Sequence, residues 1–248
     1  DYLDVDSVIQ EQKAFGACQD VTLEYPVAEN EGEEDNTYLS YNMVVGNAAD
    51  SQMAMAFEVL DYALLSAPGA PLKQALLDVK AGKDVYGSYD DGILQPYFTV
   101  IAKGSNPDRK EEFVSVIRQV LGDIVKNGID RKAVEAGINY FEFRYREADF
   151  SSYPKGLMYS LDILGDWLYE KGNPFAQVQQ LTVFEKLKKA VNAGYFEELI
   201  QKYLLDNTHG SIVIIKPERG RTARMDKELA DKLQAYKDSL SKEEIDAL

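Results

Sequence analysis

The fold is decided by the stretch from Thr37 to Ile101, which opens with TYLSYNMVV (37–45) and closes with YFTVI (97–101). Apolar residues alternate in the opening run, as in a half-buried strand, and a helix is expected to follow from about Ser51. The small-residue break SAPGAP (66–71) separates that helix from a second one, and two more strands flank the turn DDG (90–92). Together with the alternating strand VTLEY (21–25) just before it, the stretch predicts a ββααββ unit.

Local signals on both sides of this unit predict how the rest of the chain is arranged. We expect the two strands at the start to pair with each other, and Gly82 to end the second helix in the left-handed conformation. A series of helices follows from about residue 106, and then the apolar run IVII (212–215) forms a strand inside the sheet, ended by Pro217. The predicted fold class is α+β, with a mixed, largely antiparallel sheet and helices mainly on one face.

The predicted domain organisation has three parts. Residues 1–20 form an N-terminal connector, residues 21–217 form the α+β domain, and residues 218–248 begin a helical linker that leaves the domain. Ser241 and Glu244 form a capping box, which starts a helix close to the last residue of the chain. The chain also begins at Asp1 without an initiator methionine, so we expect it to be a fragment of a longer protein.

Composition and charge exclude several classes of partner. The formal net charge of -15 disfavours nucleic acid and anionic membrane surfaces, because both would be repelled. No apolar run approaches the roughly 18 residues of a membrane span, and no signal peptide is visible. The composition is that of a soluble globular protein, and it leaves the compartment open, with the cytoplasm favoured.

Catalytic and metal-binding motifs are not found. Cys18 and His209 are the only cysteine and the only histidine, so a structural zinc site of the usual Cys/His kind is excluded. His209 precedes a strand within a turn, and a structural or exposed role is favoured over a role as a catalytic base. The glycines form neither a phosphate loop nor a dinucleotide fingerprint. We therefore predict no catalytic, cofactor-binding or metal-binding residue.

Three charged segments of the sequence each allow a functional interpretation, but for each one a purely structural interpretation is favoured. The acidic loop EGEEDN (31–36) has the oxygen ligands for calcium but not their regular spacing, so a solvated turn is favoured. The predicted helix after Asp130 carries carboxylates suited to acid–base or metal chemistry, but interleaved arginines favour a salt-bridged solvent face. The basic turn after residue 217 has the charge to bind phosphate or a terminal carboxylate, but a solvated connector is favoured. The helix carries Glu135, Glu142 and Glu147 beside Arg144 and Arg146, and the turn carries Arg219, Arg221 and Arg224.

Three motifs, in order, carry a resemblance to a known family. The run TYLSYNMVVG (37–46) resembles the second strand of that family, and SAPGAPLKQAL (66–76) resembles its small-Pro-Leu helix start. The run KNGID (126–130) resembles the joint before its long helix. With this spacing, most of residues 15–217 is similar to one domain of the pitrilysin/insulinase family of zinc metallopeptidases, in the presequence-protease branch.

The resemblance implies a place in a larger enzyme. Such enzymes are hinged clamshells of four related α+β domains, and the first domain carries an inverted His-x-x-Glu-His zinc motif. A helical hairpin joins the two halves, and LQAYKDSLSKEE (233–244) resembles its beginning, which would make this chain the second domain. Where an active domain carries the zinc motif, this chain has SQMAMAF (51–57), so no zinc ligand or catalytic glutamate can be assigned to it.

The expected function follows from the position of this chain as the second domain of the larger enzyme. The chain would be a non-catalytic domain, inactive alone, that helps to enclose a substrate chamber for unfolded peptides. Its partners would be the catalytic domain and the C-terminal half of the same polypeptide, with zinc bound in the catalytic domain. A stand-alone interaction or assembly protein with the same fold is the main alternative. A hydrolase that works through its own carboxylates is a third one.

Overall fold

The computed structural model describes residues 8–148, 150–169, 175 and 178–247, and they contain one five-stranded sheet in the order β1-β5-β2-β4-β3. Strands β1 and β5 run parallel, and the other three neighbouring pairs are antiparallel. The predicted mixed, largely antiparallel sheet is therefore confirmed. The strands are β1 (Gln19–Val27), β2 (Thr37–Val44), β3 (Asp84–Asp90), β4 (Tyr97–Ser105) and β5 (Gly210–Arg219).

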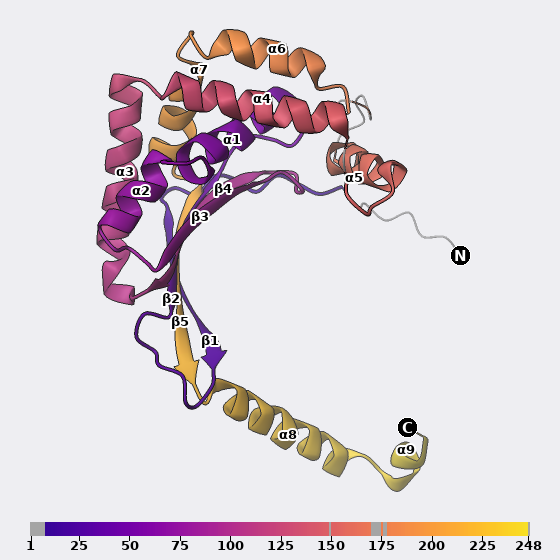
Figure 1. The fold of residues 1–248 in the computed structure, drawn as a ribbon. Coiled ribbons are helices and arrows are strands. Elements are labelled where there is room, and N and C mark those ends of the chain that lie inside the picture. Colours follow the sequence, from indigo (N-terminus) through magenta and orange to yellow (C-terminus); the bar gives the residue numbers. More distant parts are fainter. Residues whose placement is uncertain (1–7, 149, 170–174, 176–177, 248) are drawn as a thin grey trace.

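Most helices cover one face of this sheet, as Figure 1 shows. Helices α1 to α4, α6 and α7 lie on that side, α5 lies beyond the end of the sheet, and α8 leads away from it. The helices are α1 (Ser51–Asp61), α2 (Pro71–Asp78), α3 (Lys110–Asn127), α4 (Arg131–Glu147), α5 (Lys155–Trp167), α6 (Leu181–Ala190), α7 (Tyr195–Leu199), α8 (Arg221–Ser239) and α9 (Lys242–Ala247). Short π-helical turns at Tyr62–Ser66 and Ile200–Leu205 extend α1 and α7, and a 3₁₀ turn at Pro107–Arg109 precedes α3.

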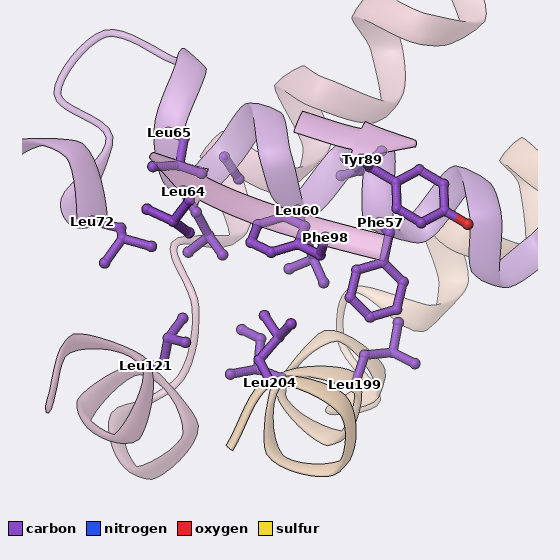
Figure 2. Packing of buried hydrophobic residues seen from close by; sticks show 14 of the residues in the cluster. Phe57, Leu60, Leu64, Leu65, Leu72, Tyr89, Phe98, Leu121, Leu199 and Leu204 are labelled. Atoms are coloured by element: carbon purple, nitrogen blue, oxygen red, sulfur yellow. The ribbon is translucent and has the colours of Figure 1, made fainter. Parts of the chain in front are cut away.

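The core lies between the helical layer and the sheet. Phe57 of α1 is fully buried, and its ring centroid lies 5.7 Å from that of Tyr89 on β3 and 5.9 Å from that of Tyr203. In Figure 2, Phe57 and Leu60 of α1 lie beside Phe98 of β4, and Leu121, Leu199 and Leu204 border the same cluster. The alternating pattern of β2 and the helical spacing of α1 thus meet in one continuous core.

The expected pairing of the two strands at the start is wrong. β5 lies between β1 and β2, so that Val213 is opposite Val21 on one side and Ser40 on the other. Because β5 is apolar, it is most stable inside the sheet, where the backbone N–H and C=O groups on both of its edges form hydrogen bonds with neighbouring strands. Both segments are strands, as predicted, and β2 alternates between buried and half-buried residues, but β1 is exposed on both faces from Gln19 to Glu24. Alternation also does not specify which strand lies beside which.

The predicted ends of one helix and one strand also differ from the structure. Helix α2 ends at Asp78, and Lys80, with φ of 55°, takes the left-handed conformation that was expected at Gly82. A Cβ atom at Gly82 would lie 2.7 Å from the backbone oxygen of Lys103, so this glycine permits close approach to β4. Pro217 does not end β5 either, because beyond Ile215 the strand pairs only with β1 and a missing N–H is tolerated.

The capping box at the end of the chain is confirmed. The backbone N–H of Ser241 donates to Oε2 of Glu244 at 2.8 Å, and the backbone N–H of Glu244 donates to Oγ of Ser241 at 3.3 Å. In the part of the chain that the structure describes, no helix is both long and apolar enough to cross a membrane.

Candidate functional site

The concave face of the sheet lies opposite the helical layer, and no labelled helix covers it in Figure 1. Its centre carries a row of neutral polar side chains held by hydrogen bonds. Thr99 Oγ1 donates to Oδ1 of Asn42 at 2.6 Å, and Nδ2 of Asn42 donates to Ser40 Oγ at 2.9 Å and to the backbone oxygen of Ser211 at 3.2 Å. This row holds no charged group.

An apolar row crosses the same face toward the edge of the sheet. The register places Leu23, Ile215 and Tyr38 side by side across β1, β5 and β2. Leu23 is 52% exposed and Val21 is 37% exposed. Strand β1 is the last strand in the sheet order, so among the described residues its outer backbone edge is unpaired. The open face therefore ends on an exposed strand with aliphatic side chains.

Helix α1 occupies the place where the resemblance locates a zinc motif in an active domain. Met53, Ala54 and Phe57 of this helix are buried in the core, and Asp50 caps it by accepting a hydrogen bond from the backbone N–H of Met53 at 2.9 Å. Nowhere among the described residues do three or more His, Cys, Asp or Glu side chains come together in a group that could hold a metal ion. The residues of this segment do not fit zinc.

The carboxylates of α4 do not come together as a site. Glu142 forms ion pairs with Arg146, at 2.7 Å, and with Lys188 of α6. Hydrogen bonds from Lys188 and Arg146 lower the pKa of Glu142. Glu135 and Glu147 are exposed elsewhere on the helix.

Contacts within the protein also hold the acidic loop. Nδ2 of Asn106 donates to Oδ1 of Asp35 at 2.7 Å, and the backbone N–H of Asp35 donates to Oδ1 of Asn106 at 2.9 Å. Nε of Arg219 donates to the backbone oxygen of Glu31 at 2.7 Å. Through these contacts the loop is tied to the start of α3 and to the end of β5.

The basic turn is paired in a similar way. Nη1 of Arg221 lies 3.2 Å from a carboxylate oxygen of Glu24 and 2.8 Å from one of Glu218, and Arg224 also pairs with Glu218. Hydrogen bonds from Arg224 and Arg221 lower the pKa of Glu218 to about 2. Because these arginines already have carboxylate partners, they form a connector between β1, β5 and α8.

His209 and Cys18 do not form a catalytic pair. His209 is 7% exposed, and its ring lies edge-on to that of Phe15 with 4.7 Å between centroids. Burial raises the pKa of the half-buried Cys18, which opposes thiolate formation. No hydrogen bond joins the two side chains among the described residues.

The sequence did not reveal a cleft beneath α5. The helical spacing of Leu157, Leu161 and Leu164 predicts one apolar helix face, and the structure leaves these side chains 49%, 53% and 39% exposed. The run GNP (172–174) predicts a helix break, and it lies outside the described residues. The one feature of the sequence that points to this cleft is the apolar face of α5, for which the sequence predicts no packing partner.

Comparison with known proteins identifies the family. A family model described as the peptidase M16 inactive domain matches residues 7–141. This chain belongs to the M16 peptidase family, as one of its inactive domains. The M16 family corresponds to the pitrilysin-type zinc metallopeptidases of the predicted resemblance, which is thereby confirmed.

Curated relatives carry this M16 domain as part of a longer chain. Protein HypA of Clostridium perfringens is 40% identical over 248 residues, which cover 100% of this chain and 25% of that protein. Presequence protease 1 of Arabidopsis thaliana, chloroplastic/mitochondrial, is 26% identical over 96% of this chain and 23% of its own length. This chain therefore spans about a quarter of the length of these relatives.

Solved structures share the fold at low sequence identity. A protease from Helicobacter pylori superposes with a TM-score of 0.64 at 14% identity, covering 88% of this chain and 48% of that one. A peptidase M16 inactive domain from Pseudomonas fluorescens has a TM-score of 0.56 at 15% identity, covering 84% and 45%. The M16 family depends on zinc in its catalytic domains, and this chain is a non-catalytic peptidase-fold domain.

Proposed function

We propose that this chain is the second domain of a longer zinc-dependent metallopeptidase, where it helps to enclose a chamber in which unfolded peptides are degraded. Residues 1–20 act as a connector, residues 21–217 as the enclosing domain and residues 218–248 as the start of the helical linker. Its partners are the catalytic domain and the C-terminal half of the same polypeptide. Zinc is bound in the catalytic domain, outside these residues.

The open concave face of the sheet is the observation that carries this proposal (Figure 1). An unfolded peptide presents backbone N–H and C=O groups and apolar side chains together. The neutral row around Asn42 offers hydrogen bonds, and the row with Leu23 and Ile215 offers apolar contact. The unpaired edge of β1 adds a place where an extended peptide can be aligned as a further strand. The relatives named presequence proteases also support a peptide substrate.

Helix α8 supports the linker role. It leads away from the domain in Figure 1, and its apolar stripe has no cover among the described residues. Leu229, Leu233 and Tyr236 on that stripe are 55%, 57% and 59% exposed. An amphipathic helix of this kind gains stability by packing its stripe against a second helix.

Peptide cleavage by two proteins tests the proposal. We expect residues 1–248 alone to be inert, and the longer polypeptide encoded around them to cleave unfolded peptides until a chelator removes its zinc. Cleavage by residues 1–248 alone would assign the chemistry to this domain and reject the proposal. A longer polypeptide that retains no zinc and cleaves nothing would favour the interaction protein instead.

A charged substitution on the open face tests the chamber role separately. In the longer polypeptide, Ser40→Glu places a carboxylate at the centre of the neutral row, while Glu135→Gln alters an exposed carboxylate on the helical side. We expect Ser40→Glu to change KM for long peptides several-fold, with zinc content unchanged, and the control to change neither. A KM that stays the same in both variants contradicts a peptide-facing role for this surface.

A further inference from the structure

A cleft lies between α5 and the body of the domain, and Asp91 of the β3–β4 turn lines it. Figure 1 shows the ribbon of α5 beyond the end of the sheet. It consists of three adjoining cavities of about 290, 340 and 650 Å³, all of them bordered by Tyr145 of α4. Cavities of this size are in the range that holds small ligands or single side chains. Helix α5 thus forms one wall of a cleft that the other described residues leave open.

Three carboxylates from three different elements line this cleft. Glu58 comes from α1, Asp91 from the β3–β4 turn and Asp162 from α5, and all three line the cavity of about 290 Å³. Among the described residues, no lysine or arginine forms an ion pair with any of them. Arg144 also lines the cavity, but its guanidinium lies over the ring of Tyr140, 5.7 Å from the centroid. The cleft therefore holds more negative charge than its own residues neutralise.

The pKa values of these groups are raised mainly by burial, and neighbouring carboxylates add to the shift. Burial, together with the charges of Asp91 and Asp61, raises the pKa of Glu58 to about 7, and Arg144 opposes this only in part. Partial loss of hydration and the charge of Asp91 also raise the pKa of Asp162. A cation placed between the carboxylates would relieve their mutual repulsion.

Aromatic rings form the remaining walls. Phe141 and Tyr145 of α4 line the cavity together with Phe150 and Tyr159, and the ring centroids of Phe150 and Tyr159 lie 5.4 Å apart. An ammonium or guanidinium group is attracted to the faces of such rings, and more strongly where water is excluded. Carboxylates among aromatic rings thus favour a cation and disfavour a neutral or anionic ligand.

The outer surface of α5 extends this cleft with apolar side chains. Leu161 lines the cavity of about 340 Å³ and is 53% exposed, and Trp167 at the end of the helix is 54% exposed. A peptide whose basic side chain entered the cleft would have room to lay apolar neighbours along this helix. The occupant that fits both parts is a basic segment with apolar flanking residues.

We propose that the cleft beneath α5 binds one lysine or arginine side chain of a peptide, between the carboxylates of Glu58, Asp91 and Asp162. The aromatic rings of α4 and α5 hold the alkyl stem and the charged head, and apolar peptide neighbours rest on α5. This site lies among helices and apart from the open face of the sheet. The inference therefore goes beyond the proposed chamber role and does not depend on it.

Intrinsic fluorescence tests the proposal on residues 1–248, because Trp167 is the only tryptophan in the chain. The probes are two short capped peptides of leucine and alanine, one with a central arginine and the other with a central citrulline. The two central side chains are similar in shape, but only arginine is charged. We expect the arginine peptide to quench or shift the emission and to bind about tenfold more tightly than the citrulline peptide. Equal affinities, or no binding of either peptide up to millimolar concentration, would overturn the proposal.

A double variant locates the binding. Glu58→Gln with Asp162→Asn removes two charges from the cleft, and Glu135→Gln with Asp123→Asn removes two charges from exposed helix positions. We expect the cleft variant to lose the preference for arginine and the control to keep it, with folding checked by circular dichroism. If both variants lose the preference equally, general attraction to an acidic protein explains binding and the site is rejected. If the cleft variant fails to fold, the comparison of the two peptides on the unmodified chain still decides whether charge is recognised.

Discussion

Glu58 should make the stability of this domain depend on pH between about 4.5 and 7. It sits on α1 at the edge of the core, where burial, followed by the charges of Asp91 and Asp61, raises its pKa from 4.5 to about 7. The substitution Glu58→Gln keeps the shape of the side chain and removes its titration. Any difference in pH dependence between the two proteins then reports on this one group.

The sign follows from which state holds the proton. Between about pH 4.5 and 7 the folded protein keeps Glu58 protonated, while the unfolded chain has already released that proton. Raising the pH therefore favours the unfolded state, so the stability that protonated Glu58 contributes is fully present below pH 4.5 and is lost as the pH rises through 7. A shift from 4.5 to about 7 corresponds to roughly 3.5 kcal/mol at most, at about 1.4 kcal/mol for each pH unit.

Urea unfolding at several pH values between about 5 and 8 measures this effect. Relative to Glu58→Gln, the unmodified protein should lose about 2–3 kcal/mol in free energy of unfolding across that range. Glu135→Gln, on the exposed side of α4, should show the same pH dependence as the unmodified protein. A difference between the unmodified protein and Glu58→Gln that stays constant with pH, within about 0.5 kcal/mol, would refute the reasoning.

Two further predictions concern packing and backbone conformation. Phe57→Ala should lower the free energy of unfolding by about 3–5 kcal/mol, because it opens a cavity in the fully buried core. Phe143→Ala, at a side chain that is 61% exposed, should change it by less than about 0.5 kcal/mol. If thermal unfolding shows comparable losses for the two variants, the assignment of Phe57 to the core is contradicted. Gly46→Ala should destabilise the domain more than Gly69→Ala: both glycines have φ of 74°, but only at Gly46 would a Cβ atom meet a side chain, Cε of Met53 at 1.9 Å. Equal losses in chemical denaturation would show that Met53 moves aside without cost.

The elements themselves were largely predictable from local sequence. The spacing of Phe57, Leu60 and Leu64 specifies one buried helix face, and all three side chains are buried in the structure. Asp130 caps α4 by accepting hydrogen bonds from the backbone N–H groups of Lys132 and Ala133. These signals act over a few residues, because helix periodicity and capping depend only on near neighbours in the chain. The absence of the zinc motif is likewise visible without a structure.

Only the tertiary structure decided the sheet order and the cleft. β5 is inserted between β1 and β2 from almost two hundred residues away, and it makes a parallel pair that local alternation cannot specify. The carboxylates Glu58, Asp91 and Asp162 line one cavity from three elements far apart in sequence, with no shared motif. The sequence by itself therefore determined which segments are helix or strand, which faces are apolar, and that no zinc motif is present. Strand neighbours and the groups that share a cleft were decided by long-range packing, because they depend on contacts between segments that no local pattern encodes.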